Sequence, residues 1–449
     1  MNYYYRTCLL LVILLTLKVP LLAQSQDTVD FRFTLDEAIA YALDHQTAVI
    51  NAKVDEQMAQ NTVKQTIGIG LPQVTTDLSF QDYLKLPTSL LPGEFFGQPG
   101  TQVPVQFGVK YQASAGIRVD QKIFDGTYLV GLKASKTYRE LSVRNSRRTR
   151  IETAVAVTKA YYSVLVNNEQ LTLIDANLAQ LRKSLHDTEA MFKNGFAEKI
   201  DVDRLQVLEN NLETERENVS RLLTLNVDLL KFQMGMPIGR TLALEESIAS
   251  VQEGQQALVT DTTAYRSRIE YALLETQKEL NILNFKRIRS EFLPTLSGYY
   301  NASKSYQSND FSELTRTDFP TSVLGLSLTW PLISGGQRTF RVRNARLEIL
   351  KSENDLGNLR NSINLEISQT QKLYNNSLRS LENQRRNLAL AQEILRVSRI
   401  KYEQGVGSSL EVTTAETAQK EAQNNYITAL YDMLIQRVDL ERATGRINY

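Results

Sequence analysis

The segment Ile174–Leu212 reads IDANLAQLRKSLHDTEAMFKNGFAEKIDVDRLQVLENNL, and its pattern decides the fold. Apolar residues recur at alternating steps of four and three on both sides of Gly195. Such heptads predict two helices packed as a coiled coil, with the glycine turning the chain between them. The first seam is Ile174, Leu178, Leu181, Leu185, Thr188 and Phe192, and the second is Leu205, Leu208, Leu212, Glu215, Val219, Leu222, Asn226 and Leu229.

The same pattern returns 210 residues later in the chain. Phe192-Lys-Asn-Gly195 matches Tyr402-Glu-Gln-Gly405, and six residues after each glycine an acid precedes a valine. These acids are Asp201 and Glu411. In this second copy the long helix has a heptad seam of Leu388, Ala391, Leu395, Ser398 and Tyr402. Self-similarity at a fixed spacing indicates a duplicated structural unit.

The duplication extends to the segments before the coiled coils. Leu71-Pro72 matches Leu293-Pro294 at a spacing of 222 residues, and VDQKIFDG at 119–126 matches LTWPLISG at 328–335 at a spacing of 209. The loop 87–104 is longer than its counterpart near 309–320, which accounts for the change in spacing. A repeat that keeps its register on both sides of a variable loop is a strong signal.

Each unit therefore has the predicted order helix, strand, loop, strand, long helix, turn, helix. The first repeat covers 34–248, with strands at 73–86 and 105–124, a long helix at 132–194 and a return helix at 197–234. The second repeat covers 261–449, with strands at 295–308 and 321–333, a long helix at 337–404 and a return helix at 408–444.

The predicted strands alternate between apolar and polar residues. In 324–330, for example, Leu324, Leu326, Leu328 and Trp330 alternate with Gly325, Ser327 and Thr329. Period-two alternation fits a half-buried antiparallel strand, whose apolar face meets either a soluble core or lipid. Because bacterial membrane barrels begin at about eight strands, four strands per chain must be completed by other subunits or form an ordinary sheet.

Composition excludes some classes of protein and favours long helices. The 449 residues carry 51 Lys and Arg against 50 Asp and Glu, which argues against a strongly basic nucleic-acid binder, and we expect no nucleic-acid partner. Past the N-terminus there is no apolar run of about 20 residues, as a membrane-spanning helix would need. Between Pro104 and Pro237 the chain has no proline, which favours long uninterrupted helices.

The N-terminal residues 1–23 are predicted to be a secretory signal peptide. Arg6 precedes the apolar stretch LLLVILLTLKVPLL, which Lys18 and Pro20 make a poor membrane anchor. The only cysteine, Cys8, lies in this segment, so the mature chain would have no thiol. The only two histidines, His45 and His186, have no zinc-site spacing, and we find no phosphate-binding or nucleophile motif. We therefore expect no enzyme activity, metal or cofactor.

These features together resemble the TolC-like outer-membrane efflux protein family. The resemblance rests on the signal peptide, the duplication, the Leu-Pro turns, the strands ending in QKIFDG and WPLISGG, and the Phe/Tyr-x-x-Gly turns followed by an acid. It covers about 34–445. No single motif is specific, but their order, duplication and spacing are.

The resemblance implies an α+β membrane protein that assembles as a homotrimer. Each chain would contribute four strands to a shared twelve-stranded β-barrel in outer-membrane lipid, and its antiparallel coiled coils would form an α-barrel across the periplasm. The tunnel would dock to a periplasmic adaptor protein and, through it, to an inner-membrane pump. It would be a passive export duct of a tripartite efflux or type I secretion system.

The resemblance also implies roles for the turn residues. Asp201 and Glu411 match the acidic positions at the periplasmic aperture, where threefold symmetry would make each a ring of carboxylates. Both are also ordinary first-turn acids of a helix, which the helix dipole favours. A second acid expected three residues further on is replaced by Arg204 and Thr414. The candidate adaptor contacts are Gly195, Phe196, Gly405, Val406 and Gly407, which also suit a plain turn.

Two alternatives remain open from the sequence. The rival to the duct is a structural coiled-coil scaffold of the periplasm, for which the alternating strands would be unnecessary. Within the duct class, the residues do not separate drug or metal efflux from protein secretion.

Overall fold

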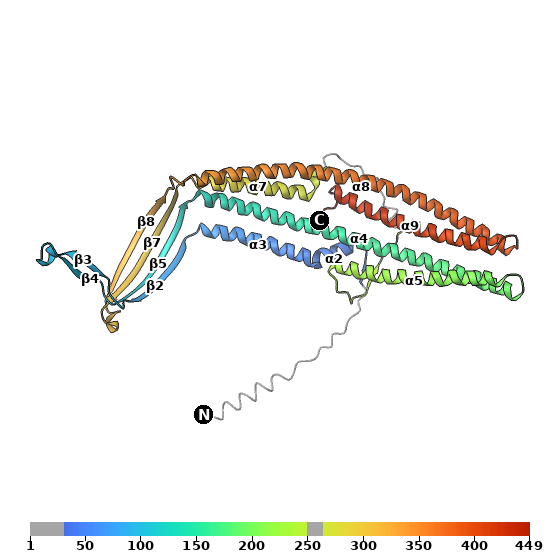
Figure 1. Cartoon of the computed structure of the whole chain (residues 1–449), viewed down its shortest axis with the longest axis horizontal. Coiled ribbons are helices and arrows are strands. Elements are labelled where there is room, and N and C mark those ends of the chain that lie inside the picture. Colours follow the sequence, from blue (N-terminus) through green and yellow to red (C-terminus); the bar gives the residue numbers. More distant parts are fainter. Residues whose placement is uncertain (1–30, 249–263) are drawn as a thin grey trace, which may run out of the picture.

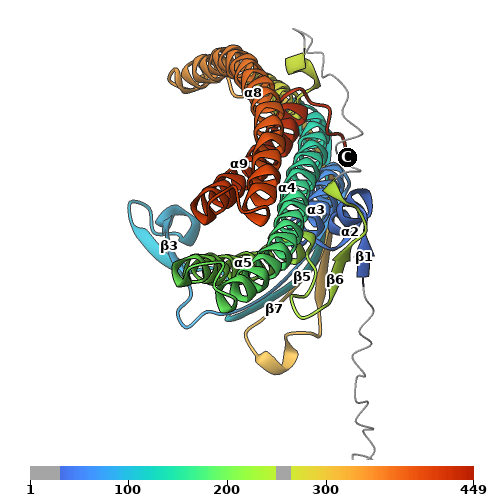
Figure 2. The ribbon, with the colours of Figure 1, turned by 90° about the vertical axis from the view of Figure 1, so that its right-hand side faces the viewer.

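The computed structural model describes residues 31–248 and 264–449, so the signal segment predicted at 1–23 lies outside the described residues. The molecule is elongated, with a β-sheet at one end and two helical hairpins at the other (Figure 1). Viewed along its length, the helices form a curved layer with one concave side (Figure 2). A hydrophobic core between the sheet and the hairpins contains residues of both repeats and joins them.

The two hairpins are antiparallel coiled coils. In the first repeat α4 (Gly126–Lys193) returns through α5 (Lys199–Met234), and in the second α8 (Gln337–Glu403) returns through α9 (Ser409–Ala443). At 1.5 Å per residue, the 68 residues of α4 span about 100 Å.

The predicted seams form the cores of these hairpins, with exceptions at their ends. The first core joins α4 to α5 and contains Ile174, Leu178, Leu181, Leu185, Leu205, Leu212 and Val219. Phe192, Leu222 and Leu229 are exposed instead. The second core is small, since it consists of Leu395, Val412 and Ala415, with Tyr402 packed against them.

The helix α4 begins six residues earlier than the predicted start at 132. Asp125 caps it, because its Oδ1 accepts hydrogen bonds from the backbone N–H groups of Thr127 and Tyr128 at 2.9 and 3.2 Å. Gly126 occupies the first helical position, where an added Cβ would lie 3.0 Å from the Cβ of Ser290. The glycine thus permits close packing against α7 (Ile269–Ser290), which sequence pattern alone did not reveal.

Four antiparallel strands form the main sheet in the order β2-β5-β7-β8. They are β2 (Gln73–Asp82), β5 (Tyr111–Phe124), β7 (Thr295–Ser308) and β8 (Asp318–Thr329). Val74 lies opposite Val119 in the first repeat, and Leu296 lies opposite Leu328 in the second. By the repeat spacing, Val74 corresponds to Leu296 and Val119 to Leu328. The two β-hairpins therefore share one register, and they join at β5 and β7.

The observed strands differ from the predicted ranges 73–86, 105–124 and 321–333. The loop 87–104 is not irregular, because it builds a separate hairpin of β3 (Thr88–Pro92) and β4 (Gln102–Gln106). Val105 and Gln106, predicted within the second strand of the sheet, pair with β3 instead. In the second repeat the last strand starts earlier, at Asp318, since Asp318 and Phe319 pair with β7.

The main sheet has one apolar and one polar face. Facing pairs such as Val74–Val119 and Tyr300–Leu324 place apolar residues on one face, to which Leu326, Leu328 and Leu78 belong by register. The other face carries Asp77, Arg118, Asp120, Asn301 and Ser303. In the single chain the apolar face is open: Leu324 is 82% exposed and Leu78 78%.

The largest core lies between the sheet and the hairpin ends. It packs α2 (Leu35–His45) and the middle of α4 against α9, around Tyr161, Leu230 and Met433. The parallel pair β1 (Phe31–Phe33) and β6 (Leu242–Leu244) covers it. The first helix of repeat one is two helices, since α3 (Thr47–Ile69) starts anew after Gln46. Short 3-10 turns at Gly93–Phe96, Ala264–Ser267 and Phe311–Glu313 complete the fold.

A buried arginine ties the second repeat together at this level. Arg268, 5% exposed, pairs with Glu270 at 2.9 Å and with Glu366 of α8 at 3.1 Å. Its Nη1 also donates to the backbone oxygen of Ala443 at the end of α9, at 3.1 Å. The start of α7, the middle of α8 and the end of α9 are therefore fixed to one another.

Candidate functional site

The two hairpin tips lie at the same end of the molecule and share one turn geometry (Figure 1). Gly195 and Gly405 have φ of 79° and 74°, a region that side chains with a Cβ rarely enter. In each tip the residue after the glycine donates a backbone hydrogen bond to the residue five positions earlier: Phe196 to Met191 at 2.8 Å, and Val406 to Lys401 at 3.0 Å. The two tips thus share the same turn conformation and the same hydrogen-bond pattern.

The side chains at the tips point into solvent. Phe196 is 80% exposed and Val406 75%. Gly407 packs tightly on α8, because an added Cβ would lie 2.9 Å from the Cβ of Lys401. Each tip therefore presents one exposed apolar side chain on a hydrogen-bonded turn.

The two predicted aperture acids occupy the same helix position in different surroundings. Asp201 lies in the first turn of α5, where its Oδ2 accepts a hydrogen bond from Glu198 N at 3.2 Å and its Oδ1 lies 3.7 Å from Arg204 Nη1. Its side chain is only 17% exposed. Glu411 lies in the first turn of α9, capped by Ser408 Oγ at 3.2 Å from its backbone N, and is exposed. Of the two, only Glu411 offers its carboxylate freely to solvent.

A residue of the second hairpin reaches the first hairpin beside Asp201. The hydroxyl of Tyr402 is buried without a hydrogen-bond partner, next to a cavity of about 50 Å³ lined by Thr188, Leu205 and Val412 among others. Burial raises the pKa of Tyr402, and the nearby negative charge of Asp201 adds to the rise. Tyr402 and Asp201 therefore lie on facing surfaces of the two hairpins.

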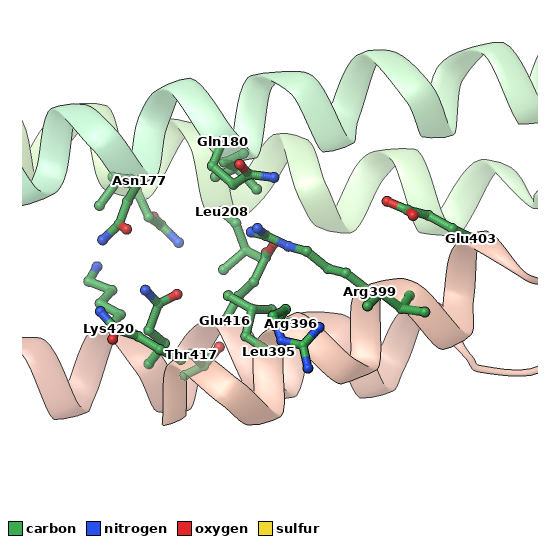
Figure 3. Close-up of a pocket in the computed structure, with 16 residues that line it drawn as sticks. Asn177, Gln180, Leu208, Leu395, Arg396, Arg399, Glu403, Glu416, Thr417 and Lys420 are labelled. Carbon is green, nitrogen blue, oxygen red and sulfur yellow. The ribbon is translucent and has the colours of Figure 1, made fainter. Parts of the chain in front are cut away.

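A cleft of about 620 Å³ lies between the two hairpins, next to the contact of Tyr402 with the first hairpin (Figure 3). The first hairpin contributes amide and leucine side chains, including Asn177, Gln180 and Leu208. The second contributes five charged groups, which are Arg396, Arg399, Glu403, Glu416 and Lys420. The facing surfaces are thus polar and incompletely packed, unlike the seams within each hairpin.

An ion pair between α8 and α9 lies within this cleft. Arg399 Nη2 and Glu416 Oε1 are 3.0 Å apart, and the Glu416 side chain is only 10% exposed. Arg399 Nε and Glu416 Oε2 are buried without a partner. Burial raises the pKa of Glu416, although Arg399 opposes the rise.

On the side of the cleft toward the middle of the helices, polar contacts bridge the hairpins. Glu215 of α5 pairs with Lys420 of α9, and its Oε1 accepts a hydrogen bond from Asn424 Nδ2 at 3.3 Å. Asn177 of α4 bonds Gln423 of α9. Sequence analysis placed Glu215 in the coiled-coil seam of its own hairpin, but its carboxylate binds the neighbouring hairpin.

The heptads and the repeat predict the two turns and the acids that follow them, but not the groups between the hairpins. Thr188 and Tyr402 were identified only as seam residues, and Arg399 and Glu416 were not singled out. One signal in the sequence points to Arg399 and Glu416. Each is a charged residue that directly follows a residue of the coiled-coil seam, Ser398 and Ala415 respectively.

Within 31–248 and 264–449, no three His, Cys, Asp or Glu side chains gather as a metal site would require. No helix in the same ranges combines the length and apolarity needed to cross a membrane.

The family model for the outer membrane efflux protein matches residues 38–230 and 284–446. The chain belongs to this family. It is 21% identical over 341 residues to the outer membrane protein TolC of Vibrio cholerae serotype O1, which covers 75% of this chain and 77% of that protein. It is 24% identical over 329 residues to the alkaline protease secretion protein AprF of Pseudomonas aeruginosa, covering 71% and 66%.

Solved structures share the fold of this family member. The channel CusC superimposes with a TM-score of 0.76 at 17% identity, covering 92% of each chain. The outer membrane channel CmeC of Campylobacter jejuni gives a TM-score of 0.73 at 14% identity, covering 92% of this chain and 86% of that one. The α+β fold class expected from the sequence is confirmed.

Family and relatives together identify the chain as an outer-membrane efflux or secretion channel and not an enzyme. It resides in the outer membrane, with its helical tunnel in the periplasm. The alternative of a periplasmic scaffold is therefore wrong.

Proposed function

We propose that three copies of this chain form the outer-membrane duct of a tripartite efflux or type I secretion system. The observation that carries the proposal is the sheet, which has two open edges, one apolar face and one polar face. Its strands continue into the helices (Figure 1), which form a curved layer (Figure 2). The family is that of outer membrane efflux proteins, and the relatives AprF and PrtF are named as protease secretion proteins.

Closure of the sheet supports the trimer. The strands β2 and β8 each leave one row of backbone N–H and C=O groups unpaired, which lipid cannot satisfy. Pairing β8 of one copy with β2 of the next removes every edge, and three copies give twelve strands. The apolar face, with Leu78 and Leu324, then meets lipid, and the polar face, with Arg118 and Asp120, lines water.

The opposite end supplies the docking and gating surfaces. Phe196 and Val406 are exposed apolar side chains at neighbouring tips, and Gly195, Gly405 and Gly407 hold their turns. We assign these tips to the periplasmic adaptor, through which the inner-membrane pump delivers its substrate. The duct itself has no energy source and opens where its hairpins meet.

Two rings of carboxylates would then surround the inner aperture. Threefold symmetry places three copies of Glu411 and three of Asp201 near the tips. A ring of like charges attracts cations and tunes selectivity. Because Asp201 is largely buried and bonded to Glu198, we assign the stronger effect on ions to Glu411.

Fractionation and trimer migration test the duct. The purified outer membrane should contain the chain as a species that migrates as a trimer without heating and as a monomer after boiling. Planar bilayers with the purified protein should show discrete channels. A monomer without channel activity would contradict the proposal.

Adaptor docking is tested with a photo-crosslinking amino acid at Val406. Because this side chain is 75% exposed at the tip, we expect a crosslink to an adaptor encoded beside the channel gene. The matched control is Leu347, which is 61% exposed on α8 toward the sheet end. Equal crosslinking at both positions, or at neither, would argue against tip docking.

A further inference from the structure

The β3–β4 hairpin (residues 83–110) is a part of the molecule that the duct does not explain. It extends beyond the end of the main sheet that lies away from the helices (Figure 1). The second repeat has only the short turn around Phe311–Glu313 at the corresponding place. The segment is thus specific to the first repeat.

The tip of this hairpin is a built loop. Gly93 N donates to Thr101 O at 2.7 Å, and Gln98 N donates to Gly93 O at 2.9 Å. Gly93 is buried, and an added Cβ would lie 2.2 Å from Gln98 O, so the loop closes tightly. This scaffold presents Phe95 and Phe96, which are 79% and 50% exposed.

The β3–β4 hairpin is apolar and nearly uncharged, as a surface buried against a partner would be. Between Leu86 and Val109 the only charged side chain is that of Glu94. Leu90 and Phe107 are more than half exposed in addition to the two tip phenylalanines. Because an isolated two-stranded hairpin is marginally stable in water, this one needs a partner surface.

Hydrogen bonds at its base fix the direction in which the hairpin extends. Tyr83 N donates to Lys110 O at 2.8 Å, and Lys110 N donates to Asn309 Oδ1 at 3.1 Å, which ties the base to the β7–β8 turn. Viewed along the molecule, β3 lies on the concave side of the helical layer (Figure 2).

We propose that the three β3–β4 hairpins of a trimer meet over the outer mouth of the barrel and close it as a lid. The tips, with Phe95 and Phe96, pack against the same residues of the two other copies. The partner is thus a second copy of this chain, and the inference rests on the proposed trimeric duct.

The position of the hairpin decides against lipid as its partner. In a closed barrel lipid surrounds the convex side, while the axis and the other two copies lie on the concave side. An apolar hairpin on the concave side reaches the axis, where its own symmetry copies are the nearest surfaces. Apolar packing of three tips excludes water without an ionic lock, so the lid yields to outward-moving cargo.

A cysteine at Phe95 tests the contact. The only natural cysteine, Cys8, lies in the predicted signal segment, so Phe95→Cys introduces a single thiol into the predicted mature chain. Identical residues of three copies meet only near the axis. We therefore expect oxidation of the assembled trimer to link two of its three chains by a disulfide. These chains should then migrate as a covalent dimer after the trimer is dissociated without reductant. The control is Arg316→Cys in the β7–β8 turn, where the side chain is 77% exposed, and it should not crosslink.

Conductance tests the lid itself. The double variant Phe95→Ser/Phe96→Ser keeps the loop backbone, and a second variant joins Leu86 to Gly108 through Asn-Gly. Both should raise single-channel conductance in planar bilayers and admit large antibiotics from outside. A trimer that conducts but shows neither the crosslink nor the rise overturns the lid and leaves the duct intact. Failure to form a trimer or channel overturns both.

Discussion

At the scale of single residues, the cleft between the hairpins holds a buried carboxyl group with too few hydrogen-bond partners. Glu416 is nine-tenths buried, and one of its oxygens has no partner even though Arg399 pairs with the other. Taking a carboxylate out of water costs more than one contact returns. The hairpin that carries the exposed Glu411 is therefore held together partly by a carboxyl group whose burial favours the neutral form.

This makes the second hairpin sensitive to pH. The folded pKa of Glu416 lies above its usual value of 4.5, so the folded state binds more protons than the unfolded state above that pH. Its contribution to stability is therefore full below about pH 4.5 and is lost as pH rises through the folded pKa. Hydrogen exchange of the tip of α9, corrected for intrinsic rates, should accelerate over this window.

Glu416→Gln removes the titrating group and keeps the shape. We expect it to flatten the pH dependence of exchange in 409–420. The control Glu411→Gln, at an exposed position in the same helix, should keep the wild-type dependence. The same slope in all three proteins would show that another group titrates.

The proposed aperture role of Glu411 and Asp201 gives a graded prediction. Glu411→Gln should reduce the cation preference of single channels and their block by divalent ions in planar bilayers, because its carboxylate is exposed. Asp201→Asn should have a smaller effect, since the side chain is 17% exposed and asparagine also suits a helix N-terminus. If both variants kept the wild-type conductance and block, neither acid would line the aperture.

The sequence predicted these acids and turns because they repeat at a fixed spacing. It did not predict that Tyr402 lies beside Asp201, or that Glu215 binds Lys420. Such contacts depend on how two hairpins sit side by side, and heptads specify only the packing within each hairpin.

At the scale of elements, glycine acts in opposite ways in one helical hairpin. Gly405 needs its positive φ to end α8, whereas Gly357 lies within α8 with open space around its Cα. Glycine inside a helix costs about 0.5–1 kcal/mol relative to alanine. A turn glycine is required, but a helix glycine weakens the helix around it.

Two alanine variants separate these roles. Gly405→Ala should destabilise the tip by about 1 kcal/mol, because a Cβ at positive φ is strained. Exchange in 400–412 should then accelerate by about fivefold. Gly357→Ala should instead slow exchange around 350–364. Acceleration in both variants would contradict the assignment.

Elements were predictable where one local pattern governs the chain. The long helices followed from uninterrupted heptads, and the main strands from alternation. The β3–β4 hairpin was read as a loop, because Pro92 and Pro104 interrupt its strands, and proline is normally confined to edges. Its two strands are both edges, so the prolines are tolerated there.

At the scale of the whole molecule, the internal junction between repeats predicts the junction between copies. Val119 of β5 faces Tyr300 of β7. By the repeat spacing, Val119 corresponds to Leu328 and Tyr300 corresponds to Leu78. If every junction in the ring is alike, Leu328 of one copy faces Leu78 of the next. Both lie on the apolar face, as a shared register requires.

A cysteine pair tests this register. Leu328→Cys/Leu78→Cys should link neighbouring copies by disulfides after oxidation, because facing residues of antiparallel strands have Cα atoms about 5 Å apart. The pair Leu328→Cys/Phe80→Cys is shifted by two residues and should link poorly. Preferential linking of the shifted pair would show that the junctions are not equivalent.

The presence of the β3–β4 hairpin in only one of the two repeats determines how many such hairpins an assembly can hold. In the proposed trimer, three chains would supply six similar repeats around one axis, and six copies of a bulky hairpin would crowd a common point. Because only the first repeat carries the β3–β4 hairpin, such a ring would hold three of these hairpins. The difference between the two repeats would thus give the walls of the tunnel near-sixfold symmetry and its outer opening threefold symmetry.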